Sequence, residues 1–303
     1  MLNKNEIEKY HQAGTIAADA MKKAKRYVSN GRKLVNICDD LEEFIKKQGA
    51  EPAFPVNISV NQIAAHYSSP ANDDLTIPER AIVKIDLGAH IDGYISDHAK
   101  TFFVEPTSTY HHLRDTAELA LENAINFVKP GIRTSDIGEV IEETIRNENL
   151  VPITDLTGHV IKRWQLHAGT SIPNFKPFFG FLGPKIKEGD VLAIEPFVTT
   201  EDGSEEVYEE SYSFIFSQKG KKSKSKYGKK VVKAIERYNH LPFAIRWLDS
   251  VMSETRLFEA IKELLSLGTI IKYPMLVSKS QTPVAQAEHT VIVTKNGCDI
   301  ITK

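Results

Sequence analysis

Cysteine is scarce in this sequence, which has only Cys38 and Cys298 among its 303 residues. Two distant cysteines cannot form a disulfide scaffold, and their separation fits no common metal-binding spacing, so we expect a reducing, cytoplasmic location. Long hydrophobic runs are also lacking, because the longest stretch free of charged residues, 52–72, is interrupted by polar side chains. The sequence therefore predicts neither a membrane-spanning helix nor a signal peptide.

A large net charge is absent as well, since 38 basic and 40 acidic side chains leave a formal charge of −2. We therefore expect no general attraction to DNA or to an anionic membrane. Hydrophobic residues make up 41% of the chain and charged residues 26%, which is typical of a globular protein with a substantial core. No pattern indicates an oligomer, and we expect a monomer.

The segment KIDLGAHIDGYISD, residues 84–97, predicts a β-hairpin that carries carboxylates on both strands. Apolar and polar residues alternate before the turn signal Asp92-Gly93, and β-forming residues follow it. With the turn centred just before Asp92, Asp86 is expected to pair directly with Asp97. Like charges that face each other destabilise a sheet, and a cation between the two carboxylates would remove that cost.

An internal repeat with an offset of 100 residues relates segments 24–49 and 124–149, which share an aromatic residue, a glycine and a Glu-Glu pair in step. Helices are expected over 7–24, 36–47 and 135–147. Two long copies predict a pseudo-symmetric domain, because solenoids need three or more shorter repeats. The expected strands are 57–65, 81–88 and 93–104 in the first half, and 158–167, 190–198 and 287–294 in the second.

The repeat also predicts acidic counterparts in the second half. Glu195 follows an apolar run much as Asp86 does, and Glu288 leads into a β-forming run as the partner of Asp97. Four carboxylates suit two divalent cations, and a histidine is a reasonable fifth ligand.

The segment TGHVIKRWQLHAG is the best place for that histidine. On a regular strand His159 and His167 would lie about 26 Å apart, so both cannot bind one ion unless the chain turns between them. We therefore assign His159 to the metal. His66 and His167 occupy corresponding positions in the two halves, and we expect them to flank the site.

An insertion is predicted over residues 201–279, because the first acidic pair is 11 residues apart and the second 93. Helical patterns over 229–239, 241–250 and 254–268 indicate a small winged-helix-like subdomain, and 1–200 with 280–303 are expected to form the main domain. Eight lysines and no acidic residue lie within 219–233. We interpret them chiefly as solvated surface, with a transient ribosome or RNA contact as the alternative.

Taken together, the motifs KIDLGAHIDGYISD, GHVI, AIEPF and AQAEHTVIV resemble the metal-binding motifs of the methionine aminopeptidases. The insertion and the run AFPVNISVNQIAAHYSSP resemble the type II branch, in a short form without its N-terminal extension. The resemblance covers nearly the whole chain. It implies an α+β pita-bread fold, a pseudo-twofold repeat with antiparallel sheet, and removal of the N-terminal methionine from nascent polypeptides.

By residue, the resemblance implies two divalent metal ions held by Asp86, Asp97, His159, Glu195 and Glu288. These ligands do not choose between Co, Mn, Fe and Zn. Two such ions would supply a hydroxide near neutral pH, with Glu195 as the general acid and base.

The resemblance also implies contacts with the substrate. His66 and His167 are expected to be catalytic or to bind the scissile peptide. The walls of the methionine pocket are expected to include Phe54, Leu166, His167 and Tyr273.

Two alternatives remain at this stage. Prolidase and aminopeptidase P use a similar ligand set but usually carry an extra N-terminal domain, whereas the first repeat begins here within about 25 residues of Met1. Non-catalytic pita-bread proteins that bind ribosomes or RNA lose ligands, whereas this sequence has all five. We therefore predict a metal-dependent enzyme.

Overall fold

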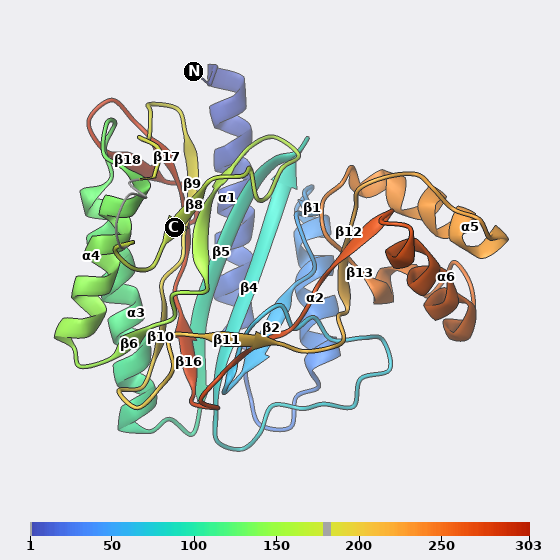
Figure 1. Ribbon diagram of the computed structural model, residues 1–303, viewed down its shortest axis with the longest axis horizontal. Helices are drawn as coiled ribbons and strands as arrows, with labels where there is room; N and C mark the ends of the chain where they lie inside the picture. Colours follow the sequence, from blue (N-terminus) through green and yellow to red (C-terminus); the bar gives the residue numbers. More distant parts are fainter. Residues whose placement is uncertain (1, 178–182) are drawn as a thin grey trace.

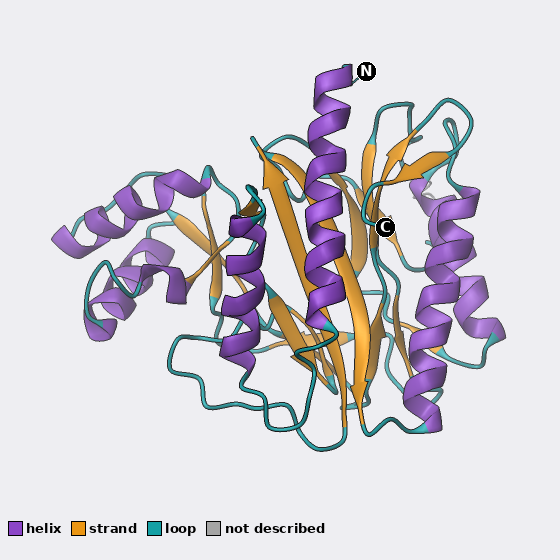
Figure 2. Cartoon of the chain, turned by 180° about the vertical axis from the view of Figure 1, so that it is seen from behind, coloured by secondary structure: helices purple, strands orange, loops and turns teal. Residues whose placement is uncertain are grey.

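The computed structural model describes residues 2–177 and 183–303. Antiparallel strands from the two halves of the chain lie side by side at the centre, and the helices of the repeat cover one face of them (Figures 1 and 2). The covering helices are α1 (Lys4–Ala24), α2 (Leu34–Lys47), α3 (Ser108–Phe127) and α4 (Thr134–Asn147). Helices α2 and α4 begin and end 100 residues apart, in agreement with the predicted repeat.

Each half has its own set of strands. The first half contains β1 (Glu51–Pro52), β2 (Asn57–Val60), β3 (Ile63–Ala65), β4 (Ala81–Ile91) and β5 (Tyr94–Val104). The second half contains β6 (Val151–Pro152), β7 (Thr157–Ile161), β8 (Ser171–Pro173), β9 (Val191–Ile194), β10 (Phe197–Thr199), β16 (Val284–Gln286), β17 (His289–Val293) and β18 (Cys298–Ile300). Two large buried apolar clusters lie under the helices, one formed mainly by the first half and the other mainly by the second.

The predicted register of the β4–β5 hairpin is wrong by two residues. Ile91 pairs with Tyr94, so Asp92 and Gly93 form the whole turn, with φ values of 51° and 81°. Two left-handed residues match the twist of a tight hairpin. Asp86 consequently faces Ala99, and Asp97 faces Gly88. The two aspartates are diagonal neighbours on one face of the sheet.

Gly93 is expected to tolerate no larger side chain, because its backbone is left-handed and a Cβ atom there would lie 2.3 Å from Cδ2 of Trp164. We expect Gly93→Ala to lower the free energy of unfolding by about 2–4 kcal/mol, which combines backbone strain with overpacking. Gly131→Ala is the matched control, since φ is +95° but nothing lies within 4 Å. Urea denaturation that gave the two variants equal stability would contradict this explanation.

The strand predicted over 158–167 is also wrong in its second half. Strand β7 ends at Ile161, and a bridge between Lys162 and Gln165 reverses the chain, with Trp164 at φ 60°. The backbone N–H of Trp164 donates to the Gly93 carbonyl oxygen at 2.8 Å. The hairpin tip therefore supports the turn that brings His167 back toward His159.

Other predicted strands are shorter in the structure. The segment 57–65 breaks at Asn61, where φ is 54°, into β2 and β3. The segment 190–198 is interrupted after Ile194, and β9 and β10 join different sheets. In the last predicted strand, 287–294, β17 begins at His289. The last two breaks leave Glu195 between β9 and β10, and Glu288 directly before β17, whereas Asp86 and Asp97 lie within β4 and β5.

The predicted insertion, residues 201–279, contains the elements from β11 to β15. It comprises β11 (Val207–Glu209), β12 (Ile215–Gln218), α5 (Lys226–Ile235), the 3₁₀ helix η1 (Glu236–Tyr238), β13 (Phe243–Ala244), the 3₁₀ helix η2 (Ile245–Leu248), α6 (Glu254–Ser266), β14 (Ile270–Tyr273) and β15 (Leu276–Ser278). The helix expected over 241–250 is wrong, because its first part pairs with β12. Helices α5 and α6 project to one side (Figure 1), and the domain boundaries at 201 and 279 stay a prediction.

Within residues 2–177 and 183–303, no helix is both long enough and sufficiently apolar to span a bilayer.

Candidate active site

The predicted metal ligands converge between the two halves of the chain. Asp97 on β5, His159 on β7 and Glu288, which precedes β17, place one ligand atom each within 4.8 Å of one another. Nε2 of His159 lies 3.4 Å from Oδ2 of Asp97 and 3.7 Å from Oε1 of Glu195. Asp86, the diagonal neighbour of Asp97, lines the same cavity. The structure thus brings together all five predicted residues.

Backbone hydrogen bonds tie β5 to the segment that carries Glu288. The N–H of Asp97 donates to the Thr290 hydroxyl at 2.7 Å, and that hydroxyl lies 2.7 Å from the Asp97 carbonyl oxygen. The N–H of Glu288 donates to the carbonyl oxygen of Ala99 at 3.0 Å. The main-chain groups of Asp97 and Glu288 therefore hold β5 against the segment of Glu288, without use of the two carboxylates themselves.

The carboxylates of the site repel one another in a buried setting. Burial raises the pKa of Asp97 to about 7. Burial, and then the neighbouring carboxylates, raise the pKa values of Asp86, Glu195 and Glu288 well above their ordinary range. Such a cluster is stable only with protons or cations among its members.

Unpartnered oxygens provide a test of whether a metal fits here. Among the described residues, Oδ1 of Asp86, Oδ1 of Asp97 and Oε1 of Glu288 are buried without a hydrogen-bond partner. Buried polar atoms in folded proteins normally have partners. Hard divalent cations prefer carboxylate oxygens, and imidazole suits transition metals. The residues present therefore fit bound divalent metal.

The histidines lie beside this cluster. The rings of His159 and His167 are 4.4 Å apart between centroids, far closer than the strand geometry predicted, because the chain turns after Ile161. His66 makes an edge-to-face contact with Tyr273 at 5.8 Å, and His167 stacks on Tyr273 at 6.1 Å.

Burial lowers the pKa values of His66 and His159 to about 4. The pKa of His167 is lowered too, first by partial burial and then by His159 and His66, although its side chain keeps exposed surface. All three imidazoles are therefore neutral near pH 7, which suits a metal ligand and hydrogen-bond donors.

A cavity of about 250 Å³ lies over the carboxylates. It is lined by all four predicted pocket residues, Phe54, Leu166, His167 and Tyr273. Its other apolar walls were not predicted from the sequence; they are Ala65, Leu156, Phe197, Ile215, Pro242 and Leu276. Ile215 and Pro242 come from the inserted segment, and no local pattern marks them as lining residues.

Three polar residues of the site also escaped prediction. Nε2 of Gln286 donates to Oε2 of Glu195 at 3.4 Å. Asn174 donates to the carbonyl oxygens of Leu156 and Glu195, at 2.9 and 3.1 Å. Asn57, opposite Asp86 in the β2–β4 register, lines the cavity. The contacts of these residues arise from the pairing of distant segments, which the sequence does not show. Gln286 could have been predicted, because it lies only two positions before Glu288 in AQAEHTVIV.

Comparison with known proteins agrees with this geometry. The chain belongs to metallopeptidase family M24, which matches residues 8–295. It is 40% identical to the methionine aminopeptidase of Methanothermobacter thermautotrophicus over 299 residues, which cover 98% of this chain and 99% of that protein.

Solved structures share the fold. The methionine aminopeptidase of Thermotoga maritima aligns with a TM-score of 0.73 at 25% identity, over 100% of this chain and 98% of that one. A thermophilic Arx1 aligns with a TM-score of 0.87 at 18% identity, over 99% and 91%, and shows the fold alone. The predictions of an α+β pita-bread fold and of a metallopeptidase are thereby confirmed.

Proposed function

We propose that this protein removes the N-terminal methionine from polypeptides, with metal-activated attack on the first peptide bond. The observation that carries the proposal is the convergence of His159 and four carboxylates, of which Asp97 and Glu288 are buried, on a small cavity that also has apolar walls. The names of the curated relatives support the same activity.

We assign two divalent ions to Asp86, Asp97, His159, Glu195 and Glu288. When bound, they would supply Lewis acidity and an activated water near neutral pH. Glu195 is placed to accept a proton from the attacking water and to return it to the leaving amine, since burial and neighbouring carboxylates raise its pKa. The hydrogen bond from Gln286 holds its carboxylate in orientation.

The remaining residues bind the substrate. Neutral His66 and His167 are placed to donate hydrogen bonds to the carbonyl oxygen as negative charge develops on it. Phe54, Leu166 and Tyr273 offer apolar walls that suit an unbranched thioether side chain. The small cavity volume favours one terminal side chain over an internal segment of a polypeptide.

The proposal is tested with two peptides, Met-Ala-Ser and an Xaa-Pro dipeptide, each assayed with Co²⁺, Mn²⁺, Fe²⁺ and Zn²⁺. We expect metal-dependent release of methionine from the first peptide and little cleavage of the second. Cleavage of the proline substrate alone would instead indicate a prolidase-like enzyme. Binding of RNA without cleavage of either peptide would indicate a non-catalytic protein.

The lysines of residues 219–233 lie on the inserted segment. All eight are exposed, as solvated surface requires. Nascent polypeptides as substrates, a transient ribosome contact through these lysines, a monomeric state and a cytoplasmic location stay predictions.

A further inference from the structure

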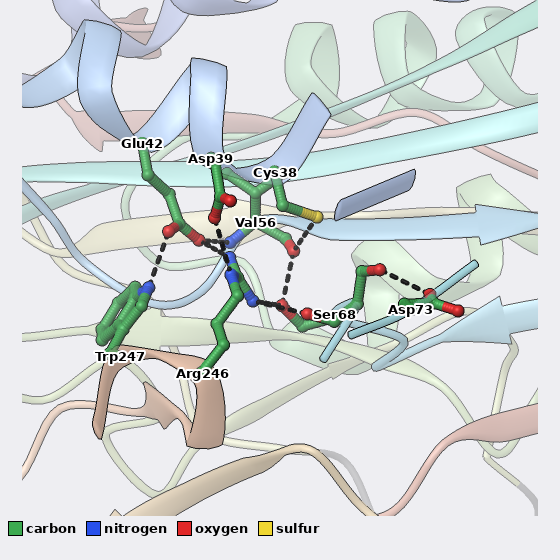
Figure 3. A network of polar contacts seen from close by, with 9 residues as sticks. Cys38, Asp39, Glu42, Val56, Ser68, Asp73, Arg246 and Trp247 are labelled. Carbon is green, nitrogen blue, oxygen red and sulfur yellow. Dashed lines mark hydrogen bonds and ion pairs between the residues drawn. The ribbon is translucent and has the colours of Figure 1, made fainter. Parts of the chain in front are cut away.

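A buried arginine joins the inserted segment to the first half of the chain. Arg246 on η2 has a side chain only 3% exposed, and its ion-pair partner Glu42 on α2 is 4% exposed (Figure 3). Nη2 of Arg246 donates to Oε1 of Glu42, and Nε donates to Oδ1 of Asp39 at 3.1 Å. The indole N–H of Trp247 donates to the second Glu42 oxygen at 2.6 Å.

The same guanidinium also contacts the chain beyond His66. Its Nη1 donates to the Ser68 hydroxyl at 2.6 Å and to the Ser69 carbonyl oxygen at 3.2 Å. His66 itself has a left-handed backbone, with φ 64°, which the surrounding contacts must maintain. Arg246 thus secures the segment directly after a residue that lines the cavity.

A third segment joins this network at Val56. Its N–H donates to Oε1 of Glu42 at 3.0 Å, and its carbonyl oxygen accepts from the Ser68 hydroxyl at 2.9 Å. Val56 lies between Phe54 and Asn57, both of which line the cavity. The ion pair therefore connects two separate wall segments of the first half.

Arg246 belongs to a third piece of the wall. It follows β13, which pairs with β12 at Ile215, and Pro242 precedes that strand. Ile215 and Pro242 line the cavity from the inserted side. Three wall segments that are distant in sequence therefore meet at one planar, five-donor side chain.

We propose that Arg246, oriented by Glu42, is a positioning residue that sets the placement of His66 and Asn57 against the substrate. This proposal deepens the proposed function and rests on it. A buried ion pair is a weak source of net stability compared with apolar packing. Its several directed hydrogen bonds instead fix geometry, and a displacement of about 1 Å at a reacting group can lower a rate 10²-fold.

The main test is Arg246→Lys, which keeps the charge but loses the planar fork of donors. We expect kcat for Met-Ala-Ser to fall about 10- to 100-fold while KM changes less than about threefold. Ser68→Ala, a small change with little risk to folding, removes the hydroxyl that links Arg246 to the Val56 carbonyl oxygen and is expected to lower kcat about 3- to 10-fold. Asp39→Asn is the matched control, because Asp39 is 61% exposed and contacts Arg246 on its solvent side.

Wild-type kcat in both Ser68→Ala and folded Arg246→Lys would overturn the proposal and leave Arg246 a purely structural residue. An equal loss in Asp39→Asn would overturn it too. If wild-type protein does not cleave Met-Ala-Ser, the proposed function fails, and the imidazole NMR signals of His66 decide the positioning role. We expect those signals to shift in Ser68→Ala and Arg246→Lys but not in Asp39→Asn, and unchanged signals in the first two would refute it.

Discussion

Glu195→Gln is expected to lower kcat for Met-Ala-Ser at least about 10³-fold. Glutamine keeps the size of the side chain but cannot exchange a proton, so it loses the general acid–base role, which is worth about 10²–10⁴. It also removes a negative charge 3.7 Å from Nε2 of His159, where we place metal. The two losses act on one step and need not add.

The measurement is steady-state cleavage at saturating substrate and metal, with the thermal midpoint recorded for each protein. Glu188→Gln is the control, because Glu188 is an exposed glutamate in the same stretch of chain. Its activity is expected to remain within twofold of wild type. Retention of more than a tenth of wild-type kcat by Glu195→Gln would rule out the assigned role.

Asp97→Asn is expected to act in opposite directions on the metal-free and metal-bound protein. In chelator, burial holds the pKa of Asp97 at about 7, above its value of 3.8 in the unfolded chain. The folded state therefore binds the extra proton more tightly, and the contribution of Asp97 to stability falls as pH rises from about 4 to about 7. Asparagine does not titrate, so the Asp97→Asn variant does not lose stability in this way as pH rises.

The buried histidines also make stability depend on pH, so the effect of Asp97 is measured as the difference in thermal midpoint between wild type and Asp97→Asn. Because the pKa values of His66 and His159 are lowered in the folded protein, their contribution to stability grows as pH rises from about 4 to 6.5. This trend is opposite to that of Asp97. That contribution is shared by wild type and variant and largely cancels in their difference. We therefore expect the midpoint of Asp97→Asn to rise relative to wild type between pH 5 and pH 7.5 in EDTA.

Added Mn²⁺ is expected to reverse the order. At 100 times its dissociation constant, a ligand stabilises the folded state by about 2.7 kcal/mol, or roughly 5–10 °C in a chain of this size. The thermal midpoint of wild type should rise by this amount, and that of Asp97→Asn should rise little. The variant should also lose most of its activity. Equal gains from Mn²⁺ in the two proteins would remove Asp97 from the ligand set.

Local patterns were sufficient where the chemistry lies within a short segment. The hairpin around Asp92-Gly93, the paired helices and the acidic residues after apolar runs were all readable from spacing. The direct pairing of Asp86 with Asp97 was wrong because the turn was placed one position too early, which shifts the cross-strand register by two residues. A two-residue shift keeps side chains on the same face, so the inference of neighbouring carboxylates survived the error.

Long-range contacts were not readable. The return of the chain after Ile161, which places His167 beside His159, depends on the support that Gly93 gives to Trp164. The ion pair between Arg246 and Glu42 joins segments roughly 200 residues apart. The cavity likewise receives Ile215 and Pro242 from the inserted segment. The local sequence pattern of a segment does not predict which distant segment it will contact.

The hydrogen bonds between Asp97 and Thr290 have a consequence for synthesis. These residues are 193 positions apart. At about 5–20 residues per second, a ribosome exposes the first roughly 10–40 s before the second. During that interval the early carboxylates lack their later companions, so ion capture must follow the emergence of the last strands.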